Sequence, residues 1–394
     1  MGDSVSTPSI SIVGKRCCGC SACVVACPVS CLELKPDACG FVHPSYENGC
    51  IGCGRCAKAC PVITVGATDD AAAVYWAKAK DDDLRNRSSS GAVFGLLAQH
   101  TIENSGSVYG AAFSDDCKSV RHVRVSNHDE LNAIMRSKYV QSVVGQDVYE
   151  DVEKDLKAGR QVIFAGTACQ NAGIRNYLTL RNDPLQNLLL IDVICHGVPS
   201  PRLWAAWLEH VSREAGSEVD GVNFRSKSTG WLTFSVAYSV ATEKVRSEEN
   251  SRDWYMRAFL RNASLRESCL DCPAKRCCGS DITLGDFWGI QNTHSEAVDN
   301  LGVSAVICNT EKGASALDAV RSSLEMGASS MEEVVPGNPA LVRSVKPYAK
   351  RDEFLGDVAN GVFIEDLMRK WTFEPSLKQK VKGKLSGLKH KVFG

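Results

Sequence analysis

Two runs of cysteines with the same spacing lie near the N-terminus of this 394-residue chain. The first run consists of Cys17, Cys20, Cys23 and Cys27, and the second of Cys50, Cys53, Cys56 and Cys60. Each run ends in a proline, and the spacing C-x2-C-x2-C-x3-C-P is typical of proteins that bind two 4Fe-4S clusters. In such proteins the fourth cysteine of each run binds the other cluster. We therefore expect one cluster on Cys17, Cys20, Cys23 and Cys60, and a second on Cys50, Cys53, Cys56 and Cys27.

Zinc is the alternative metal for these cysteines. Structural zinc sites usually take four ligands in two pairs, often with histidine. The only histidine of this segment, His43, lies outside both runs, so iron-sulfur clusters are favoured over two zinc knuckles. Cys18, Cys31 and Cys39 do not fit the spacing, and we interpret them as small buried or solvent-facing thiols. Residues 1–63 are thus predicted to form a two-cluster 4Fe-4S ferredoxin domain, which moves electrons one at a time.

Composition limits the class of protein. The chain has 19 cysteines, but secreted disulfide scaffolds are usually much shorter, so we expect a cytoplasmic location. A formal net charge of -1 argues against nucleic acid as a partner. No signal peptide is evident in residues 1–12, and no apolar run is long enough to span a membrane. Residues 374–394 are predicted to be a basic tail, for which a solvated helix is favoured over docking on an acidic partner or a membrane.

Residues 74–373 are predicted to form one large domain, joined to the module by a linker at about 62–73. Apolar stretches of the strand type alternate with amphipathic stretches of the helix type. Strands are expected at 74–79, 107–113, 120–125, 161–165, 188–194, 282–287 and 303–307 and within 221–247. Helices are expected at 89–103, 129–135, 147–157, 201–214 and 254–262, and from Gly166-Thr167 to about 178. The apolar strands indicate a sheet buried on both faces, so the fold class is α+β or α/β with a large mixed sheet.

Four cysteines of this domain could hold a third 4Fe-4S cluster: Cys169, Cys195, Cys269 and Cys272. Cys169 is expected in the first turn of a helix, where backbone N-H groups favour a thiolate. Cys195 is expected at the end of a neighbouring strand, where the sites of open α/β sheets gather. Isolated cysteines in apolar strands are more often core residues, however, and the pattern alone does not decide between the two. Either Cys277 or Cys278 could replace one of the four.

Six segments of this domain resemble the coenzyme F420 hydrogenase/dehydrogenase β-subunit family. In order along the chain they are RSSSG (87–91), RSKYVQS (136–142), GTACQ (166–170), DVICHGVPSP (192–201), NFRSK (223–227) and SDITLGDFWG (280–289). Ala168 and Ala92 stand where the family commonly has proline and glycine, which alters turns and removes no functional group. The resemblance implies a flavoprotein that holds FAD beside a 4Fe-4S cluster. It also implies that Cys169, Cys195, Cys269 and Cys272 correspond to the recurrent cysteines of the family.

The FAD site rests on this resemblance, because the chain has neither a dinucleotide-binding fingerprint nor a P-loop. Ser88, Ser89, Ser90 and Gly91 open a predicted helix and are suited to phosphate, although an ordinary serine N-cap is the simpler interpretation. Lys138 could neutralise a phosphate or the reduced flavin, although a lone lysine is usually a solvated charge. The other candidate cofactor residues are Gly166, Thr167 and Asp286. Asp286 and its neighbours Phe287 and Trp288 could line the flavin or substrate pocket, and the alternative for these three is core packing beside a turn.

These observations predict an iron-sulfur flavoprotein oxidoreductase. It would pass electrons between the two-cluster module, a core 4Fe-4S cluster and FAD, and so reduce or oxidise a small organic acceptor. The alternative is an electron-transfer subunit of a hydrogenase or dehydrogenase complex, without a substrate of its own. A zinc-stabilised binding protein is disfavoured by the two complete cysteine runs. The expected redox partner is a ferredoxin or another oxidoreductase subunit; a homo-oligomer is left open, and no catalytic residue is assigned.

Overall fold

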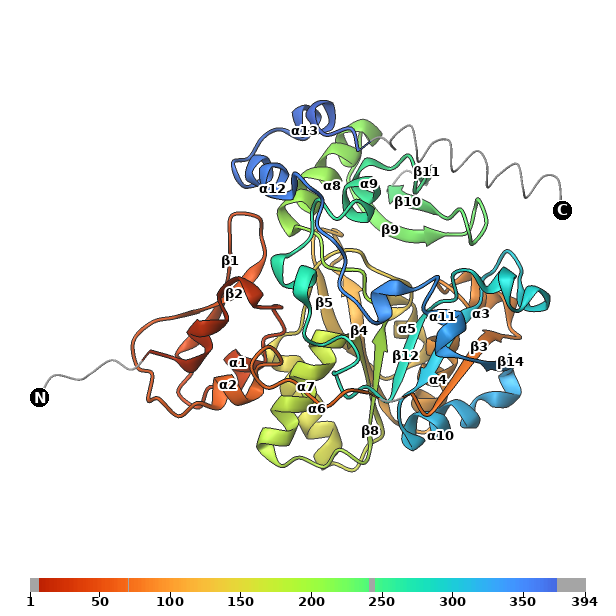
Figure 1. Cartoon of the computed structure of the whole chain (residues 1–394), viewed down its shortest axis with the longest axis horizontal. Coiled ribbons are helices and arrows are strands. Elements are labelled where there is room, and N and C mark those ends of the chain that lie inside the picture. The colour runs from red at the N-terminus through yellow and green to blue at the C-terminus, as the bar shows by residue number, and fades with distance from the viewer. Residues whose placement is uncertain (1–6, 70, 241–244, 374–394) are drawn as a thin grey trace, which may run out of the picture.

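The computed structural model describes residues 7–69, 71–240 and 245–373. Figure 1 shows three parts: an N-terminal module, a large sheet covered by helices, and a smaller helical region with its own sheet. The predicted α/β architecture with a large mixed sheet is confirmed. The predicted basic tail, 374–394, lies outside the described residues. Among the described residues, no helix is long and apolar enough to cross a membrane.

The large sheet has nine strands: β3 (Ala73–Ala79), β4 (Ser107–Phe113), β5 (Val120–Val125), β6 (Ser142–Val143), β7 (Val162–Thr167), β8 (Leu188–Val193), β12 (Ile282–Asp286), β13 (Ser304–Cys308) and β14 (Leu324–Ser329). Their order across the sheet is β14-β3-β13-β12-β8-β7-β4-β5-β6. The neighbours β12, β8, β7 and β4 are parallel, whereas β13, β3 and β14 add antiparallel strands at one edge. Because β7, β8 and β12 run in parallel, their carboxyl ends lie at the same edge of the sheet.

Helices cover both faces of this sheet. One face packs against α3 (Asp82–Asn86), α4 (Val93–Glu103), α5 (His128–Ile134) and α10 (Glu311–Ala319), and the other against α6 (Gln146–Lys157) and α7 (Ala168–Arg181). Ile163 of β7 packs toward the first group, whereas Val162 and Phe164 pack toward the second. Successive strand side chains point to opposite faces, so a strand that is apolar throughout suits a sheet buried on both sides.

A second hydrophobic core lies beyond the carboxyl ends of β4 and β12. It is formed by α8 (Pro201–Ala215), α9 (Trp254–Leu260), α12 (Arg351–Ala359), α13 (Ile364–Lys370) and an antiparallel sheet of β9 (Val219–Ser226), β10 (Ser235–Val240) and β11 (Val245–Glu249). Phe113 at the end of β4 packs on Trp204 of α8. Asp286 at the end of β12 pairs with Arg225 of β9. This region is therefore anchored to the end of the large sheet.

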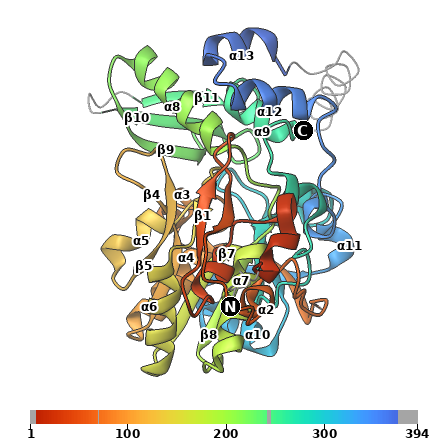
Figure 2. The ribbon, with the colours of Figure 1, turned by 90° about the vertical axis from the view of Figure 1, so that its left-hand side faces the viewer.

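The N-terminal module contains α1 (Ala22–Val25), α2 (Arg55–Ala59) and a hairpin of β1 (Leu32–Pro36) and β2 (Val42–Tyr46). Both of its helices pack on α7, and Figure 2 shows the module in front of α6 and α7. Cys20 and Ala59 belong to the same hydrophobic cluster as Tyr149 and Phe164 of the large domain. The module is thus joined to the sheet by a shared hydrophobic core.

The predicted elements differ most from the structure around residues 88–92. The helix expected over 89–103 begins only at Val93, because Ala92 adopts a left-handed backbone conformation with φ 67°. The serine segment therefore precedes the helix and does not cap it. The hairpin of the module and the strand β14 are not predicted from the sequence. Residues of β14 are mostly exposed or half-buried, because this strand forms an edge of the sheet and lacks an apolar pattern.

Candidate iron-sulfur centres

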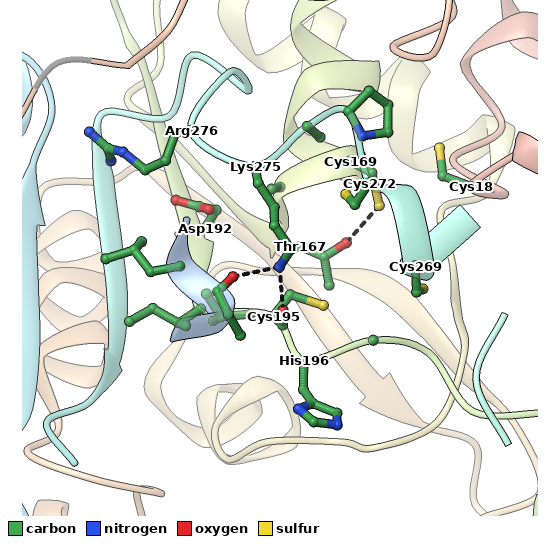
Figure 3. A pocket seen from close by; sticks show the side chains of 18 of the residues that line it. Cys18, Thr167, Cys169, Asp192, Cys195, His196, Cys269, Cys272, Lys275 and Arg276 are labelled. Atoms are coloured by element: carbon green, nitrogen blue, oxygen red, sulfur yellow. Dashed lines mark hydrogen bonds between the residues drawn. The ribbon is translucent and has the colours of Figure 1, made fainter. Parts of the chain in front are cut away.

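A cavity of about 790 Å³, partly open to solvent, lies at the carboxyl ends of β7 and β8. Cys169 enters it from the first turn of α7, directly after β7, and Cys195 from the loop that follows β8. Cys269 and Cys272 enter from the loop that includes the short 3-10 helix Glu267–Asp271. Figure 3 shows these four side chains around one space. Folding thus gathers four cysteines that are far apart in the sequence.

The four thiols affect one another's ionisation. Burial and then the thiol of Cys169 raise the pKa of Cys269 to about 12 and that of Cys272 to about 11. Burial and then the thiol of Cys269 raise the pKa of Cys195. Such thiols stay protonated at neutral pH unless a bound metal replaces their protons. Four sulfurs around one space are the donor set of a 4Fe-4S cluster, so these residues fit the group that the sequence predicts here.

The ligand atoms of a single metal ion lie closer to one another than those of a 4Fe-4S cluster. Four thiolates about 2.3 Å from one zinc ion would lie about 3.8 Å from one another. Among residues 7–69, 71–240 and 245–373, no three His, Cys, Asp or Glu side chains are close enough to hold one metal ion. In a four-iron cluster each thiolate binds a different iron atom, which spreads the sulfurs further apart. The lack of a single-ion site among these residues therefore does not bear on a cluster.

The set predicted for the first module cluster is also close together. Burial raises the pKa of Cys23, and the thiols of Cys17, Cys60 and Cys56 add to the rise. Burial raises the pKa of Cys60 as well, again with contributions from Cys17 and Cys56. A contact with the Cys18 thiol lowers the pKa of Cys20, but burial and the thiols of Cys23 and Cys60 raise it by more, so Cys20 lies in the same group. Cys60 of the second run thus lies beside the first run, which is the arrangement that crossed ligation requires.

The set predicted for the second module cluster lines a separate cavity of about 320 Å³. Its lining includes Cys27, Cys50, Cys53 and Cys56. Cys31 lines the same cavity, and its Sγ lies 3.5 Å from that of Cys27. Cys27 of the first run therefore faces the three leading cysteines of the second run. Cys31, for which the spacing suggests no role, is a fifth thiol at this site.

Cys18 connects the module with the core cavity. Its side chain lines the core cavity, and its thiol interacts with those of Cys169 and Cys20. The contact with Cys18, together with burial, raises the pKa of Cys169. The spacing of the first run leaves Cys18 out, and only its position between Cys17 and Cys20 hints at the site. The side chain of Cys18 thus lies between a predicted ligand of the first module cluster and a predicted ligand of the core cluster.

Comparison with known proteins bears on the segment that holds the core cysteines. Residues 159–334 match the family described as the C-terminal part of the coenzyme F420 hydrogenase/dehydrogenase β subunit. This segment of the chain belongs to that family. The matched segment includes Cys169, Cys195, Cys269 and Cys272. The family is one of hydrogenase and dehydrogenase subunits, so its chemistry is electron transfer within an oxidoreductase.

One solved structure similar to this chain is a chain of the F420-reducing [NiFe] hydrogenase complex from Methanosarcina barkeri, in a xenon-derivatised form. The two are 15% identical, the TM-score is 0.48, and the match covers 77% of this chain and 92% of that one. No curated protein sequence matches this chain significantly.

The serine segment that family resemblance suggests for FAD lies away from the core cavity. Ser88 and Ser90 donate hydrogen bonds to backbone carbonyls at 2.9 Å and 2.7 Å, and the Ser89 hydroxyl lies 3.1 Å from that of Ser137. The N-H of Gly91 donates to a serine hydroxyl at 3.0 Å. Each hydroxyl of the segment therefore has a protein partner in this structure.

Lys138 points into the protein. Its Nζ donates to the carbonyls of Ala133 and Met135, at 2.8 Å and 2.6 Å, at the C-terminal end of α5. Burial lowers the pKa of Lys138 to about 7. An ammonium group held in this way caps the orphan carbonyls of a helix end. The side chain is therefore not directed at the core cavity.

The remaining candidate cofactor residues divide between core packing and the cavity. Asp286 accepts hydrogen bonds from Arg225 at 2.8 Å and from the indole N-H of Trp231 at 2.6 Å. Phe287 is fully buried. Gly166 precedes Thr167, which does line the cavity and whose hydroxyl lies 3.2 Å from the Sγ of Cys169. Of the residues suggested for FAD, only Thr167 thus lines the cavity that holds the four cysteines.

Gly173 of α7 allows the module to approach the core closely. A Cβ atom at this position would lie 2.9 Å from the Sγ of Cys20. In a helix interior alanine is normally favoured over glycine by up to about 1 kcal/mol, so a glycine here reflects the close contact. We expect Gly173→Ala to displace the Cys20 thiol and change the electron paramagnetic resonance (EPR) signal of one module cluster in the reduced protein.

Gly356→Ala is the matched control for Gly173→Ala. Gly356 lies inside α12, and nothing is within 4 Å of a Cβ built on it. This variant should keep every iron-sulfur signal and gain up to about 1 kcal/mol of helix stability. Identical spectra for the wild type and both variants would contradict a cluster ligand beside Gly173.

Proposed function

We propose that this chain is an iron-sulfur flavoprotein oxidoreductase. It would pass electrons between the two-cluster module, a core 4Fe-4S cluster and FAD, and exchange them with a small organic acceptor. The observation that carries the proposal is the convergence of Cys169, Cys195, Cys269 and Cys272 on one cavity whose wall also includes Cys18 of the module. Separate one-electron sites linked in this way suit a chain that transfers electrons.

The proposal assigns three sets of ligands. The first module cluster takes Cys17, Cys20, Cys23 and Cys60, and the second takes Cys50, Cys53, Cys56 and Cys27. The core cluster takes the four cysteines of the large cavity. FAD is proposed on the family resemblance, and when bound it would supply the conversion between one-electron and two-electron chemistry. Cys277 and Cys278 are not assigned, since neither lines the cavity and the Cys278 thiol lies 3.1 Å from the hydroxyl of Ser280.

Lys275 divides the cavity into two ends. Its Nζ donates to the carbonyl of Cys195 at 2.9 Å, and it also donates to that of Ala340. Figure 3 shows Asp192 and Arg276 on the side of Lys275 away from Cys18 and Cys269. We assign the sulfur-lined end to the cluster and the polar end to the acceptor or the flavin ring.

Asp192 is suited to hold a proton at the polar end of the cavity. Its carboxylate accepts a hydrogen bond from the Thr283 hydroxyl at 2.6 Å. Burial raises the pKa of Asp192 to about 7. A carboxyl group with such a pKa can give or take a proton near neutral pH, as the two-electron reduction of an organic acceptor requires.

A second candidate function is an electron-transfer subunit without its own substrate. It is favoured by the module, where Cys53 and Ile51 are exposed at the second cluster cavity, with 63% of the Ile51 surface accessible. An apolar exposed rim of this kind suits docking of another redox protein.

Metal and flavin analysis of anaerobically purified protein distinguishes these functions. Three 4Fe-4S clusters require about twelve iron atoms per chain, and we expect this number with one bound FAD. Twelve irons without flavin would favour the electron-transfer subunit. About eight irons would remove the core cluster from the proposal, and zinc in place of iron would contradict both functions.

A further inference from the structure

Arg266 lies between the module and the core, with 1% of its surface exposed. Its Nε donates to the carbonyl of Cys17 at 2.6 Å, and one terminal nitrogen donates to the carbonyl of Val42 at 2.6 Å. The other terminal nitrogen donates to the side-chain oxygen of Gln141 at 2.8 Å. The backbone carbonyl of Arg266 accepts from the N-H of Cys269 at 3.1 Å. This one residue therefore joins a predicted ligand of the first module cluster to a predicted ligand of the core cluster.

All three side-chain acceptors of Arg266 are neutral. The buried guanidinium groups of Arg85, Arg225 and Arg351, in contrast, each pair with a carboxylate. A buried charge without an opposite charge is strongly unfavourable. Arg266 therefore needs negative charge that its hydrogen-bond partners do not supply.

The cysteine sets on both sides of Arg266 are suited to supply that charge. The Nε of Arg266 lies 2.6 Å from the carbonyl oxygen of Cys17, and Cys269 donates its N-H to the carbonyl of Arg266 at 3.1 Å. A 4Fe-4S cluster bound by four thiolates carries net negative charge, and nearby charge is one of the factors that set its potential. Binding of the clusters would thus compensate the guanidinium.

We infer that Arg266 is a positioning residue that serves as the shared counter-charge of the first module cluster and the core cluster and raises both of their reduction potentials. The inference rests on the proposed cluster assignment and adds to it a residue that couples two centres. Reduction adds an electron, so a fixed positive charge nearby favours the reduced state. The low-dielectric surroundings of a buried group make the effect larger than it would be in water.

The test is a potentiometric titration of anaerobic holoprotein, followed by EPR. Arg266→Gln removes the charge and keeps a hydrogen-bond donor, whereas Arg266→Lys keeps the charge and loses the planar fork. In Arg266→Gln we expect reduction of the first module cluster and the core cluster to become about tenfold less favourable, a shift of about 59 mV to more negative potential for one electron. In Arg266→Lys the two potentials should shift by less than half as much. The potential of the second module cluster should not change in either variant.

Arg351→Gln is the matched control. Arg351 is 6% exposed and donates to the carbonyl of Leu265 at 2.9 Å, but it pairs with Glu267 and Asp352. Its substitution should leave all three potentials unchanged. Unchanged potentials in Arg266→Gln, or equal shifts in Arg266→Gln and Arg351→Gln, would overturn the inference. If Arg266→Gln lost its clusters, the test would pass to Arg266→Lys. Loss of the clusters in Arg266→Lys, or a full tenfold effect on their reduction, would mean that the geometry of the side chain matters and its charge does not, which would overturn the inference.

The inference and the proposed function fail in different ways. A wild type with only about eight irons per chain would show that the core cluster is absent, which contradicts the proposed function itself. A wild type with about twelve irons whose potentials do not depend on Arg266 would leave the proposed function intact and overturn only the role of this residue.

Discussion

Cys195→Ser is expected to lower the iron content from about twelve to about eight atoms per chain and to remove one of three iron-sulfur signals. Cys195 lines the core cavity with Cys169, Cys269 and Cys272, so its loss removes one corner of the predicted site. A serine hydroxyl does not ionise readily and replaces a soft sulfur ligand with a hard oxygen. Iron analysis and EPR of the reduced protein measure both effects. Electron transfer to an organic acceptor should be lost as well, while the two module signals stay.

Cys278→Ala is the control for this prediction. Cys278 is more deeply buried than the four core cysteines, with 2% of its surface exposed, but its thiol faces Ser280 and Asp69 and does not line the cavity. We expect the variant to keep about twelve irons. Loss of the core signal in Cys278→Ala, with retention in Cys195→Ser, would show that the ligand set is wrong.

Asp286→Asn is expected to destabilise the protein by about 3–5 kcal/mol, as is usual when one partner of a buried ion pair is removed. The Arg225 side chain is 2% exposed, and Asp286 is the carboxylate with which it pairs, at 2.8 Å. The guanidinium also lies over the rings of Phe234 and Trp288, at 4.0 Å and 5.0 Å from their centroids. Asparagine keeps the shape of the side chain and leaves the guanidinium charge without its counter-charge. A lower midpoint of urea unfolding measures the loss.

The double variant Arg225→Met/Asp286→Asn tests the cause of that loss. It removes both charges, so it should be more stable than Asp286→Asn alone. Asp318→Asn is the surface control, since Asp318 and its partner Arg321 are 72% and 61% exposed and lie 3.8 Å apart. Its unfolding midpoint should match that of the wild type within error. A double variant less stable than Asp286→Asn would mean that Arg225 contributes mainly through packing on the two rings.

Much of the fold could be predicted from local patterns. The strands Ser107–Phe113 and Val120–Val125 have the predicted bounds, and the helix after Thr167 begins where the chemistry of its first turn suggested. These elements are long, apolar and bounded by polar or turn residues, so short-range signals define them. The start of the helix at Val93 was misplaced because the left-handed conformation of Ala92 depends on how this segment packs. Close packing also constrains Gly91, since a Cβ atom at this position would lie 2.2 Å from a backbone oxygen of β3.

The hydrogen-bond partners of the candidate cofactor residues could not be predicted from the sequence. Serine and lysine side chains suit a phosphate by residue type, but the structure uses Ser88, Ser90 and Lys138 to satisfy backbone carbonyls. Asp286 suits a polar site, but it neutralises Arg225. A polar side chain takes whichever partner folding brings near, and the chain order does not reveal that partner.

The two cysteine runs of the module could be recognised from the sequence alone, because a cluster that is bound mainly by one short segment imposes a fixed spacing on its ligands. The core site imposes no such spacing. Cys169 and Cys195 directly follow the parallel strands β7 and β8, and Cys269 and Cys272 lie in a distant loop. They meet because the carboxyl ends of β7 and β8 lie at one edge of the sheet. The positions of Cys18 and Arg266 between the module and that site likewise depend on how the module packs on the large domain. Such contacts between distant segments are a property of the tertiary structure, since no local interaction along the chain determines them.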